Sequence, residues 1–260
     1  MCGQVGIIFG RKRRRAAEMD RLIEVFVRLL LHSEVRGPHA SGLARLKTDG
    51  SHRIVKQPLP ARELIYDEAF LDALTEVDDR TTVLMGQTRW RTWGDEANNL
   101  NNHPIRAGDV IGTHNGTLYN ADYLFRRLRL PRFAEVDSEL IFRLADRCAP
   151  KGAIDLGRLG ASLAQCRGQM SAVLASRGDP GTITLLKGNK PLHLRHHRRY
   201  RLVLCASDAA LDGEPGWRDL GVPPMTMLAF VRTDLPAAVA RPLTFIAQDR
   251  RGTLPAGVAA

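Results

Sequence analysis

The sequence predicts a single α+β domain in which helices cover layered antiparallel β-sheets. Of its 260 residues, 44% are hydrophobic, which is enough to bury a large core, and 25% are charged, which is typical of globular proteins. Apolar runs of strand length come in two groups along the chain, with helical patterns before and between them. The connections are short, which favours antiparallel pairing, and no linker divides the chain.

The N-terminal half is expected to combine short strands with helices. Residues 4–9 form an apolar, β-branched run that predicts a buried strand. Apolar residues then recur at helical spacing, which predicts an amphipathic helix ending near His32 and Ser33. A hairpin is expected next, with strands at 41–46 and 53–57. A helix at 61–74 and a strand at 81–88 are expected after it.

The remainder is expected to contain a loop, then mostly helices, then strands. Residues 89–104 are rich in asparagine and aromatic residues, which predicts an irregular loop. A strand over 109–114 is expected to end at Asn115 and Gly116, because Asn-Gly is a common turn sequence. The other expected helices are 121–128, 138–148 and 156–166, and the other expected strands are 170–176, 182–187, 192–196, 202–206, 225–231 and 243–247.

The cysteines and the first residues indicate a cytoplasmic protein. Cys2, Cys148, Cys166 and Cys205 form no C-x-x-C pair, and reduced thiols are usual in the cytoplasm. The N-terminus lacks the basic segment of a signal peptide, and no apolar run is long enough for a membrane span. The last three cysteines have apolar neighbours and are expected in the core, whereas only the initiator Met1 precedes Cys2.

The net charge of +10 is concentrated in two basic clusters, residues 11–15 and 195–201. Clusters of this kind bind the phosphates of nucleic acids or dock onto acidic partners, and both remain alternatives. Arginine is abundant throughout the chain, however, and both clusters fall where short loops are expected. Solvated surface loops are therefore the preferred interpretation.

Cys2 is a candidate nucleophile, because removal of Met1 would leave it with both a thiol and a free α-amino group. Methionine aminopeptidases remove the initiator when the second residue is small, as cysteine is. An α-amino group has a pKa of roughly 7.7–8.0 and lies close enough to accept the thiol proton, directly or through one water. One residue then supplies nucleophile and base, as in N-terminal threonine enzymes.

Four further residues suit attack on the carboxamide of an amino acid. Asn115 and Gly116 offer a side-chain amide and a main-chain N–H for the charge that develops on the carbonyl oxygen, with a turn as the alternative. Arg89, at a strand end, suits bidentate binding of a carboxylate, with a surface ion pair as the alternative. Asp137 suits an ammonium group, with a helix cap as the alternative.

The order of these motifs resembles the glutaminase domain of class II, N-terminal-nucleophile glutamine amidotransferases. That family includes glucosamine-6-phosphate synthase, amidophosphoribosyltransferase, glutamate synthase and asparagine synthetase. The resemblance runs from Met1 to about Leu211 and rests on short motifs in matching order: Cys2, Arg36-Gly37…Ser41-Gly42, Thr88-Arg89-Trp90…Gly94, Asn101…His103-Pro104, His114-Asn115-Gly116…Asn120 and Asp137-Ser138-Glu139.

The resemblance implies a four-layer αββα sandwich of two antiparallel sheets, the Ntn-hydrolase type of α+β fold. It implies that Cys2 attacks the side-chain amide of L-glutamine, while Asn115 and Gly116 form the oxyanion hole. The substrate-binding and supporting residues that it implies are Arg89 for the α-carboxylate, Asp137 for the α-amino group, Trp90 and Thr92 in the pocket wall, and Arg36 beside the nucleophile.

Departures from the family pattern fall in loops and spare the residues assigned to chemistry. Arg91 and Trp93 stand where the family usually has Ala and His, and His39 stands where it usually has Asp. The amidotransferase domain is expected to span 1–235, followed by a loosely ordered C-terminal extension over 236–260.

In the family, this domain is usually fused to a synthase that consumes the ammonia, which here predicts a separate synthase subunit docking near 89–104. Two other functions remain open: an N-terminal cysteine hydrolase of another amide, and an inactive module on the same fold that binds nucleic acid or protein. No cofactor is expected. No metal is expected either, because the candidate histidines lack carboxylate or cysteine partners at ligand spacing: His103, His114, His196 and His197.

Overall fold

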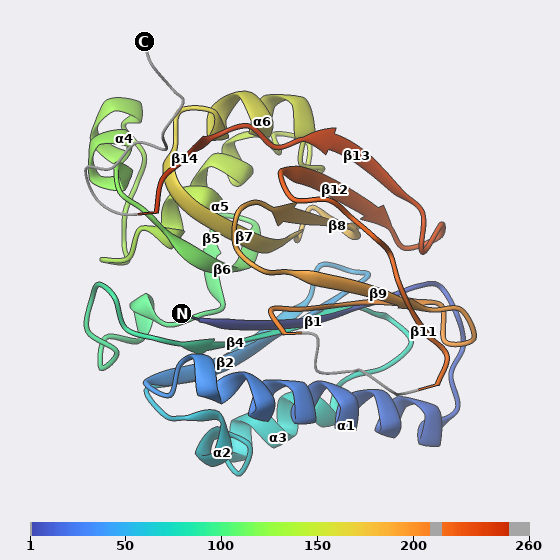
Figure 1. The fold of residues 1–260 in the computed structure, drawn as a ribbon. Helices are drawn as coiled ribbons and strands as arrows, with labels where there is room; N and C mark the ends of the chain where they lie inside the picture. Colours follow the sequence, from blue (N-terminus) through green and yellow to red (C-terminus); the bar gives the residue numbers. More distant parts are fainter. Residues whose placement is uncertain (1, 209–214, 250–260) are drawn as a thin grey trace.

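Two β-sheets packed face to face form the centre of the protein, and helices cover both outer faces (Figure 1). This arrangement is seen in a computed structural model that describes residues 2–208 and 215–249. All strand pairs are antiparallel except the short parallel pair of β14 with β7. The predicted αββα sandwich is confirmed.

The first sheet is centred on β1, which pairs with β10 on one side and β4 on the other. In spatial order its strands are β11 (Trp217–Asp219), β9 (His193–His197), β10 (Leu202–Ala206), β1 (Gly3–Phe9), β4 (Thr81–Arg89), β2 (Ala40–Lys47) and β3 (His52–Gln57). Its outer face is covered by α1 (Ala16–His32), α2 (Ala61–Leu64) and α3 (Glu68–Thr75), and the 3-10 helix η1 (Ser33–Arg36) follows α1.

The second sheet is centred on β7 and β8, which form a long hairpin. In spatial order its strands are β13 (Ala238–Pro242), β12 (Thr226–Val231), β8 (Asp179–Lys187), β7 (Arg167–Ser176), β6 (Val110–Leu118) and β5 (Ile105–Ala107), with β14 (Ile246–Ala247) beside β7. Its outer layer consists of α4 (Ala121–Leu128), α5 (Ser138–Arg147) and α6 (Leu156–Leu163), and the 3-10 helix η2 (Asn99–Asn101) precedes β5.

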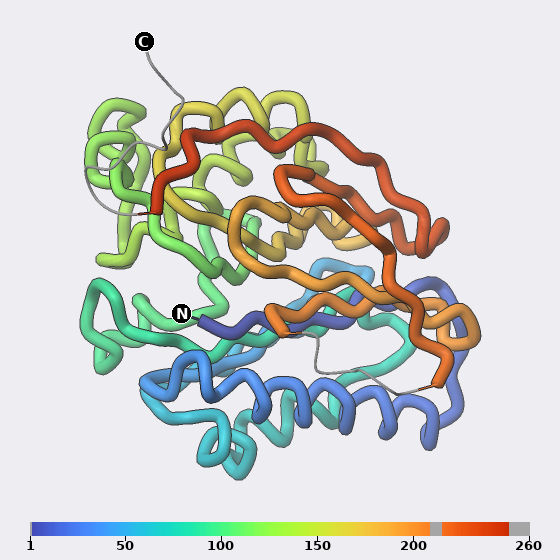
Figure 2. The backbone as a smooth tube through the Cα atoms, in the orientation of Figure 1, coloured from blue at the N-terminus to red at the C-terminus, as the bar shows by residue number. Residues whose placement is uncertain are grey.

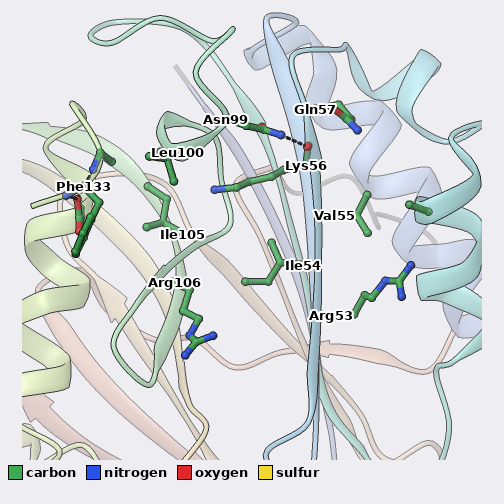
Figure 3. A pocket seen from close by; sticks show the side chains of 13 residues that line it. Arg53, Ile54, Val55, Lys56, Gln57, Asn99, Leu100, Ile105, Arg106 and Phe133 are labelled. Carbon is green, nitrogen blue, oxygen red and sulfur yellow. Dashed lines mark hydrogen bonds between the residues drawn. The ribbon is translucent and has the colours of Figure 1, made fainter.

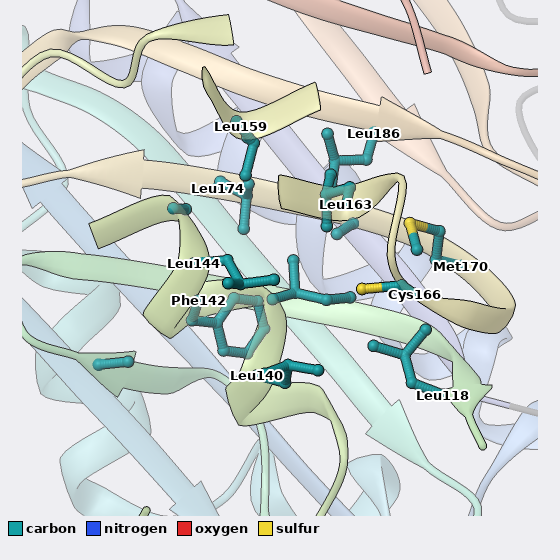
Figure 4. Packing of buried hydrophobic residues seen from close by; sticks show 14 of the residues in the cluster. Leu118, Leu140, Phe142, Leu144, Leu159, Leu163, Cys166, Met170, Leu174 and Leu186 are labelled. Carbon is teal, nitrogen blue, oxygen red and sulfur yellow. The ribbon is translucent and has the colours of Figure 1, made fainter. Parts of the chain in front are cut away.

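The strands are apolar on both faces because each sheet is covered on both sides. In β1, Val5 and Ile7 pack toward α1, whereas Ile8 packs between the two sheets. This explains why residues 4–9 form a continuous apolar run instead of an alternating one. On the outer side of the second sheet, Phe142 of α5 is fully buried and packs with Leu174 of β7 and with leucines of α6 (Figure 4).

Two predicted elements differ from the structure. The helix expected over 61–74 is two helices, because Asp67 interrupts it and caps the second one by accepting a hydrogen bond from Phe70 N at 3.1 Å. The strand expected to end at Asn115 continues through Leu118, and the predicted turn at Asn115-Gly116 is wrong. Pairing along the whole of β7 supplies the hydrogen bonds that a local turn would have made.

The stretch assigned to a C-terminal extension contributes two strands to the second sheet. β13 pairs with β12, and β14 pairs with Arg167 and Gly168 of β7. The tube in Figure 2 runs from β13 across the second sheet to β14. Main-chain pairing orders a segment whose Ala- and Pro-rich composition gave little signal. Residues 250–260 lie outside the described part, and the boundary at 235 remains a prediction.

The two basic clusters meet at the end of the molecule opposite Cys2. Lys12 Nζ donates to Arg199 O at 2.8 Å, and Arg14 donates to Tyr200 O at 2.7 Å. Arg14 is buried, which lowers its pKa to about 10, so one member of the expected solvated loop is a structural residue. The seven residues of β1 separate this end from Cys2 by roughly 23 Å.

Candidate active site

Cys2 lies immediately before β1, beside the end of β4. Its Sγ is 3.8 Å from Trp90 O, and the strand pairing places Gly3 opposite Thr88. Arg36 Nε donates to Cys2 O at 3.1 Å, and Arg36 Nη1 forms an ion pair with Asp208 at 3.0 Å. The structure therefore brings Arg36 to the main chain of Cys2.

Burial raises the pKa of the Cys2 thiol above its usual value. The Trp90 carbonyl, the positive charge of Arg89 and a hydrogen bond with the Gln87 side chain act in the opposite direction. The thiol is therefore predominantly protonated at neutral pH, and its use as a nucleophile requires a base.

Asn115 and Gly116 lie side by side in β6, opposite Ser171 and Met170 of β7. Asn115 is only 1% exposed, and its Nδ2 has no hydrogen-bond partner among the described residues. Gly116 has φ +145°, and a Cβ there would lie 2.0 Å from Gln169 O. Only glycine fits this position, because both the backbone angle and the close contact exclude a side chain.

The side chain of Gln87 connects β4 to β6 across the two sheets. Gln87 Nε2 donates to His114 O at 3.0 Å, and His114 N donates to Gln87 Oε1 at 3.0 Å. The same side chain lies near enough to the Cys2 thiol to lower its pKa. His114 precedes Asn115, so Gln87 ties the strand of the two candidate oxyanion residues to the strand beside Cys2.

Arg89 is buried at the end of β4 and is enclosed by the loop that follows it. Its Nη1 donates to Asn102 Oδ1 at 2.8 Å, and its Nη2 donates to the carbonyls of Trp93 and Gly94 at 2.6 and 2.9 Å. Burial lowers the pKa of Arg89, while Cys2 and a neighbouring acidic side chain raise it. The guanidinium thus shapes the loop beside Cys2 and is not a surface ion pair.

Asp137 precedes α5 but does not cap it with its side chain. Its Oδ2 instead accepts a hydrogen bond from Leu118 N at 2.6 Å. Burial raises the pKa of this carboxyl, and the nearby His114 opposes the shift. Asp137 is therefore a half-buried acid whose carboxylate is held at Leu118, two residues beyond Gly116 in β6.

A pocket of about 190 Å³ lies in front of Asp137. Thr92 and Trp93 line it from the loop, and Leu118 lines it from β6. Cys2, Arg89, Asn115 and Trp90 are not part of this lining. Trp90 is instead half exposed beside the pocket, and its ring packs edge-on against His39 with centroids 5.1 Å apart.

Sequence comparison relates the chain to glutamine–fructose-6-phosphate aminotransferases (isomerizing). It is 26% identical over 195 residues to the Vibrio vulnificus (strain YJ016) protein, 28% over 232 residues to the Aeropyrum pernix protein and 30% over 196 residues to the Caulobacter vibrioides protein. These matches cover 74%, 84% and 74% of this chain, but 29%, 35% and 29% of the relatives. The chain thus spans about a third of the length of these relatives. No protein-family model matches.

Comparison with solved structures decides the fold. Glutamine phosphoribosylpyrophosphate amidotransferase from B. subtilis superposes with a TM-score of 0.69 and 20% identity, over 94% of this chain and 49% of that one. A glutamine aminotransferase class-II domain protein from Silicibacter pomeroyi gives 0.57 and 15%, over 93% and 98%. The chain has the fold of a class II glutamine amidotransferase domain.

Within this fold, the sequence analysis missed Gln4 and Gln87. Gln4 Nε2 donates to Thr113 Oγ1, and Ser171 Oγ donates to Gln4 Oε1, both at 2.9 Å. Both glutamines are fully buried and connect the two sheets beside Cys2. The sequence signal that could have found them is a glutamine inside each of two apolar strands, β1 and β4. The two glutamines are opposite each other in the strand register.

Two features are absent from the described residues, 2–208 and 215–249. No group of three His, Cys, Asp or Glu side chains is arranged to hold a metal ion. None of the helices has the length and apolar character needed to cross a membrane.

Replacing Gly116 with alanine is expected to destabilise the protein, because the new Cβ would clash with Gln169 O at 2.0 Å and φ is +145°. We expect a loss of at least about 2 kcal/mol in the free energy of unfolding, measured by thermal and urea denaturation. Gly181→Ala in β8 is the matched control, since the new Cβ would lie 3.7 Å from Asp179 Oδ1, an ordinary contact. Equal stability of the two variants would contradict the prediction.

Proposed function

We propose that this protein is a glutamine amidotransferase that hydrolyses L-glutamine to glutamate and ammonia through Cys2. The observation that carries the proposal is the buried Asn115 amide, whose Nδ2 has no partner among the residues that the structure describes. A buried donor without a partner costs on the order of 1–3 kcal/mol. This donor lies in the strand that Gln87 joins to β4, beside Cys2. It therefore suits the oxyanion that forms when the thiol attacks a carboxamide. The relatives named above, which act on glutamine by name, support the choice of substrate.

The proposed reaction begins when the Cys2 thiol transfers its proton to the α-amino group exposed by removal of Met1. Sγ then attacks the side-chain carbonyl carbon of glutamine, and Asn115 Nδ2 and Gly116 N–H stabilise the oxyanion. The carbon–nitrogen bond breaks, and the leaving nitrogen takes up the proton to depart as ammonia. Water then attacks the γ-glutamyl thioester, which releases glutamate and restores the thiol.

The α-carboxylate and α-amino groups of glutamine have complementary partners in Arg89, at the end of β4, and Asp137, in the pocket lining. We assign the carboxylate to Arg89 and the ammonium to Asp137, with Trp90 and Thr92 as walls. The half-buried position of Asp137 favours a charged partner, because an ion pair there is less screened than one at the surface. A substrate without both groups would lose this orientation.

The ammonia is proposed to pass to an acceptor enzyme that docks over the loop near the pocket. Large apolar side chains are exposed there: Trp90 by 47%, Trp93 by 56%, Leu100 by 53% and Phe133 by 67%. Exposed apolar groups that lie close together are typical of interaction surfaces. Purification from the native host is expected to recover a synthase with the chain. Recovery of the chain alone, with full glutaminase activity, would count against an acceptor.

Incubation with 6-diazo-5-oxo-norleucine is expected to label Cys2 once and to abolish glutamine hydrolysis. This glutamine-like electrophile alkylates a thiol only where the amino-acid groups are bound beside it. Intact-mass analysis and peptide mapping should show loss of Met1 and one adduct on Cys2. Cys2→Ala should remain unlabelled. Labelling of Cys148 instead, or an active protein that retains Met1, would overturn the mechanism.

Replacing Asp137 with asparagine is expected to raise KM for glutamine by about 10–100-fold while lowering kcat less, because one charged hydrogen bond to the substrate is lost. In the unmodified protein, KM should also rise as the pH falls through the raised pKa of Asp137, since the protonated carboxyl no longer attracts an ammonium. The variant should lack this rise.

Steady-state kinetics across a pH series measures both effects. Asp122→Asn is the matched control, because Asp122 lines the same pocket but is exposed and paired with Arg132 at 2.7 Å. An unchanged KM in Asp137→Asn, or an equal change in both variants, would refute the assignment.

A further inference from the structure

A second pocket, of about 490 Å³, lies where the outer edges of the two sheets face each other. β3 is the last strand of the first sheet, and β5 is the last strand of the second. Apolar side chains from four segments line the space together with two cations (Figure 3): Ile54, Lys56, Leu100, Ile105, Arg106 and Phe133. The pocket thus combines an apolar wall with positive charge.

Lys56 extends from β3 across this pocket toward Leu100 and Ile105 (Figure 3). Its Nζ donates to Asn102 O at 2.7 Å and forms no ion pair with any described residue. An ammonium group has three donors, so two are available to a ligand. Burial lowers the pKa of Lys56 to about 8, which leaves it mostly charged at neutral pH. A half-buried ammonium that is not paired with a carboxylate is favourable for an anion.

The other charged groups at this pocket do not neutralise Lys56. The carboxylate of Glu139 accepts hydrogen bonds from the main-chain N–H groups of Phe133 and Ala134 and pairs with Arg143. Arg53 lies on the opposite side of β3 from Lys56 (Figure 3).

Arg106 adds a second cation on the same side as Lys56 (Figure 3). Its Nε donates to Gly108 O at 2.9 Å, and it has no ion pair within the described chain. The pocket therefore carries a net positive charge at Lys56 and Arg106.

The two pockets share their walls. The loop after β4 contributes Thr92 and Trp93 to the pocket at Asp137, and Asn99 and Leu100 to the pocket at Lys56. The segment 132–139 likewise contributes residues to both. A ligand in one pocket therefore contacts segments that shape the other.

Asn102 links the two pockets directly. Its carbonyl oxygen accepts from Lys56 Nζ at 2.7 Å, and its side-chain oxygen accepts from Arg89 Nη1 at 2.8 Å. An anion that draws Lys56 away from Asn102 would alter the hydrogen bond between Asn102 and Arg89. Arg89 is the residue assigned to the glutamine carboxylate.

We propose that the pocket between β3 and β5 binds a small organic anion with an apolar body, and that this ligand modulates glutamine binding. Lys56 and Arg106 bind the anionic group, and Ile54, Leu100 and Phe133 pack against the apolar body. The modulation, unlike the binding itself, rests on the proposed glutaminase activity.

Ligand-observed NMR titration of the full chain tests the binding. The probes are phenyl phosphate and phenylacetate, which distinguish a phosphate from a carboxylate, with phenylacetamide as the neutral counterpart. At least one anion is expected to bind about tenfold or more tightly than phenylacetamide. Lys56→Met should weaken anion binding about tenfold or more, whereas Lys56→Arg should retain it. Lys187→Met, outside the pocket, is the matched control.

Equal binding of the anions and phenylacetamide, or undiminished anion binding by folded Lys56→Met, would overturn the site. For the modulation, a saturating anion is expected to change KM for glutamine about fivefold or more in the unmodified protein, but not in Lys56→Met. Anion binding with an unchanged KM would overturn the modulation alone. Anion binding by a protein that neither hydrolyses glutamine nor reacts at Cys2 would instead overturn the proposed function and leave the site standing.

Discussion

Two glutamine side chains that cross between the sheets hold together the end of the molecule that carries Cys2. Gln4 joins β1 to β6 and β7, and Gln87 joins β4 to β6. Between two apolar sheet faces, an amide that lost its partners would cost on the order of 1–3 kcal/mol, so these bonds fix how the sheets face each other. They also fix the position of Asn115 relative to Cys2. Asn115 directly follows His114, which is bound to Gln87, and Cys2 directly precedes β1, which contains Gln4.

The same end of the molecule is closed by a loop organised around a buried charge. Arg89 takes its hydrogen-bond partners from residues 93, 94 and 102, so the guanidinium ties together distant parts of the loop. The position of Arg89 and the shape of the loop therefore depend on each other. This dependence explains how two pockets with different linings can be coupled through short contacts.

Cys2 and the two basic clusters lie at opposite ends of β1. Cys2 precedes the strand, while the residues that follow it join the second basic cluster at the far end. Glutamine is a zwitterion with no net charge, so the positive field of the far end neither attracts nor repels it strongly at this distance. The basic surface is thus not needed for the proposed reaction.

The sequence by itself determined the local periods and the order of the motifs. The spacing of apolar residues predicted α1 and the β2–β3 hairpin, and the ordered motifs singled out Cys2, Arg89 and Asp137. These signals reside within windows of a few residues, where side-chain period and turn chemistry act directly. The proposed roles of those residues await experiment.

Only the tertiary structure decided that Asn115-Gly116 continues a strand and that Gln4 lies against Thr113 and Ser171. Those partners are 109 and 167 positions away from Gln4 in the chain. The free energy of such pairings depends on groups that no local window contains, and it outweighs the preference of Asn-Gly for a turn. Strand register, the Lys56 pocket and its link to Arg89 arise only when distant segments pack together.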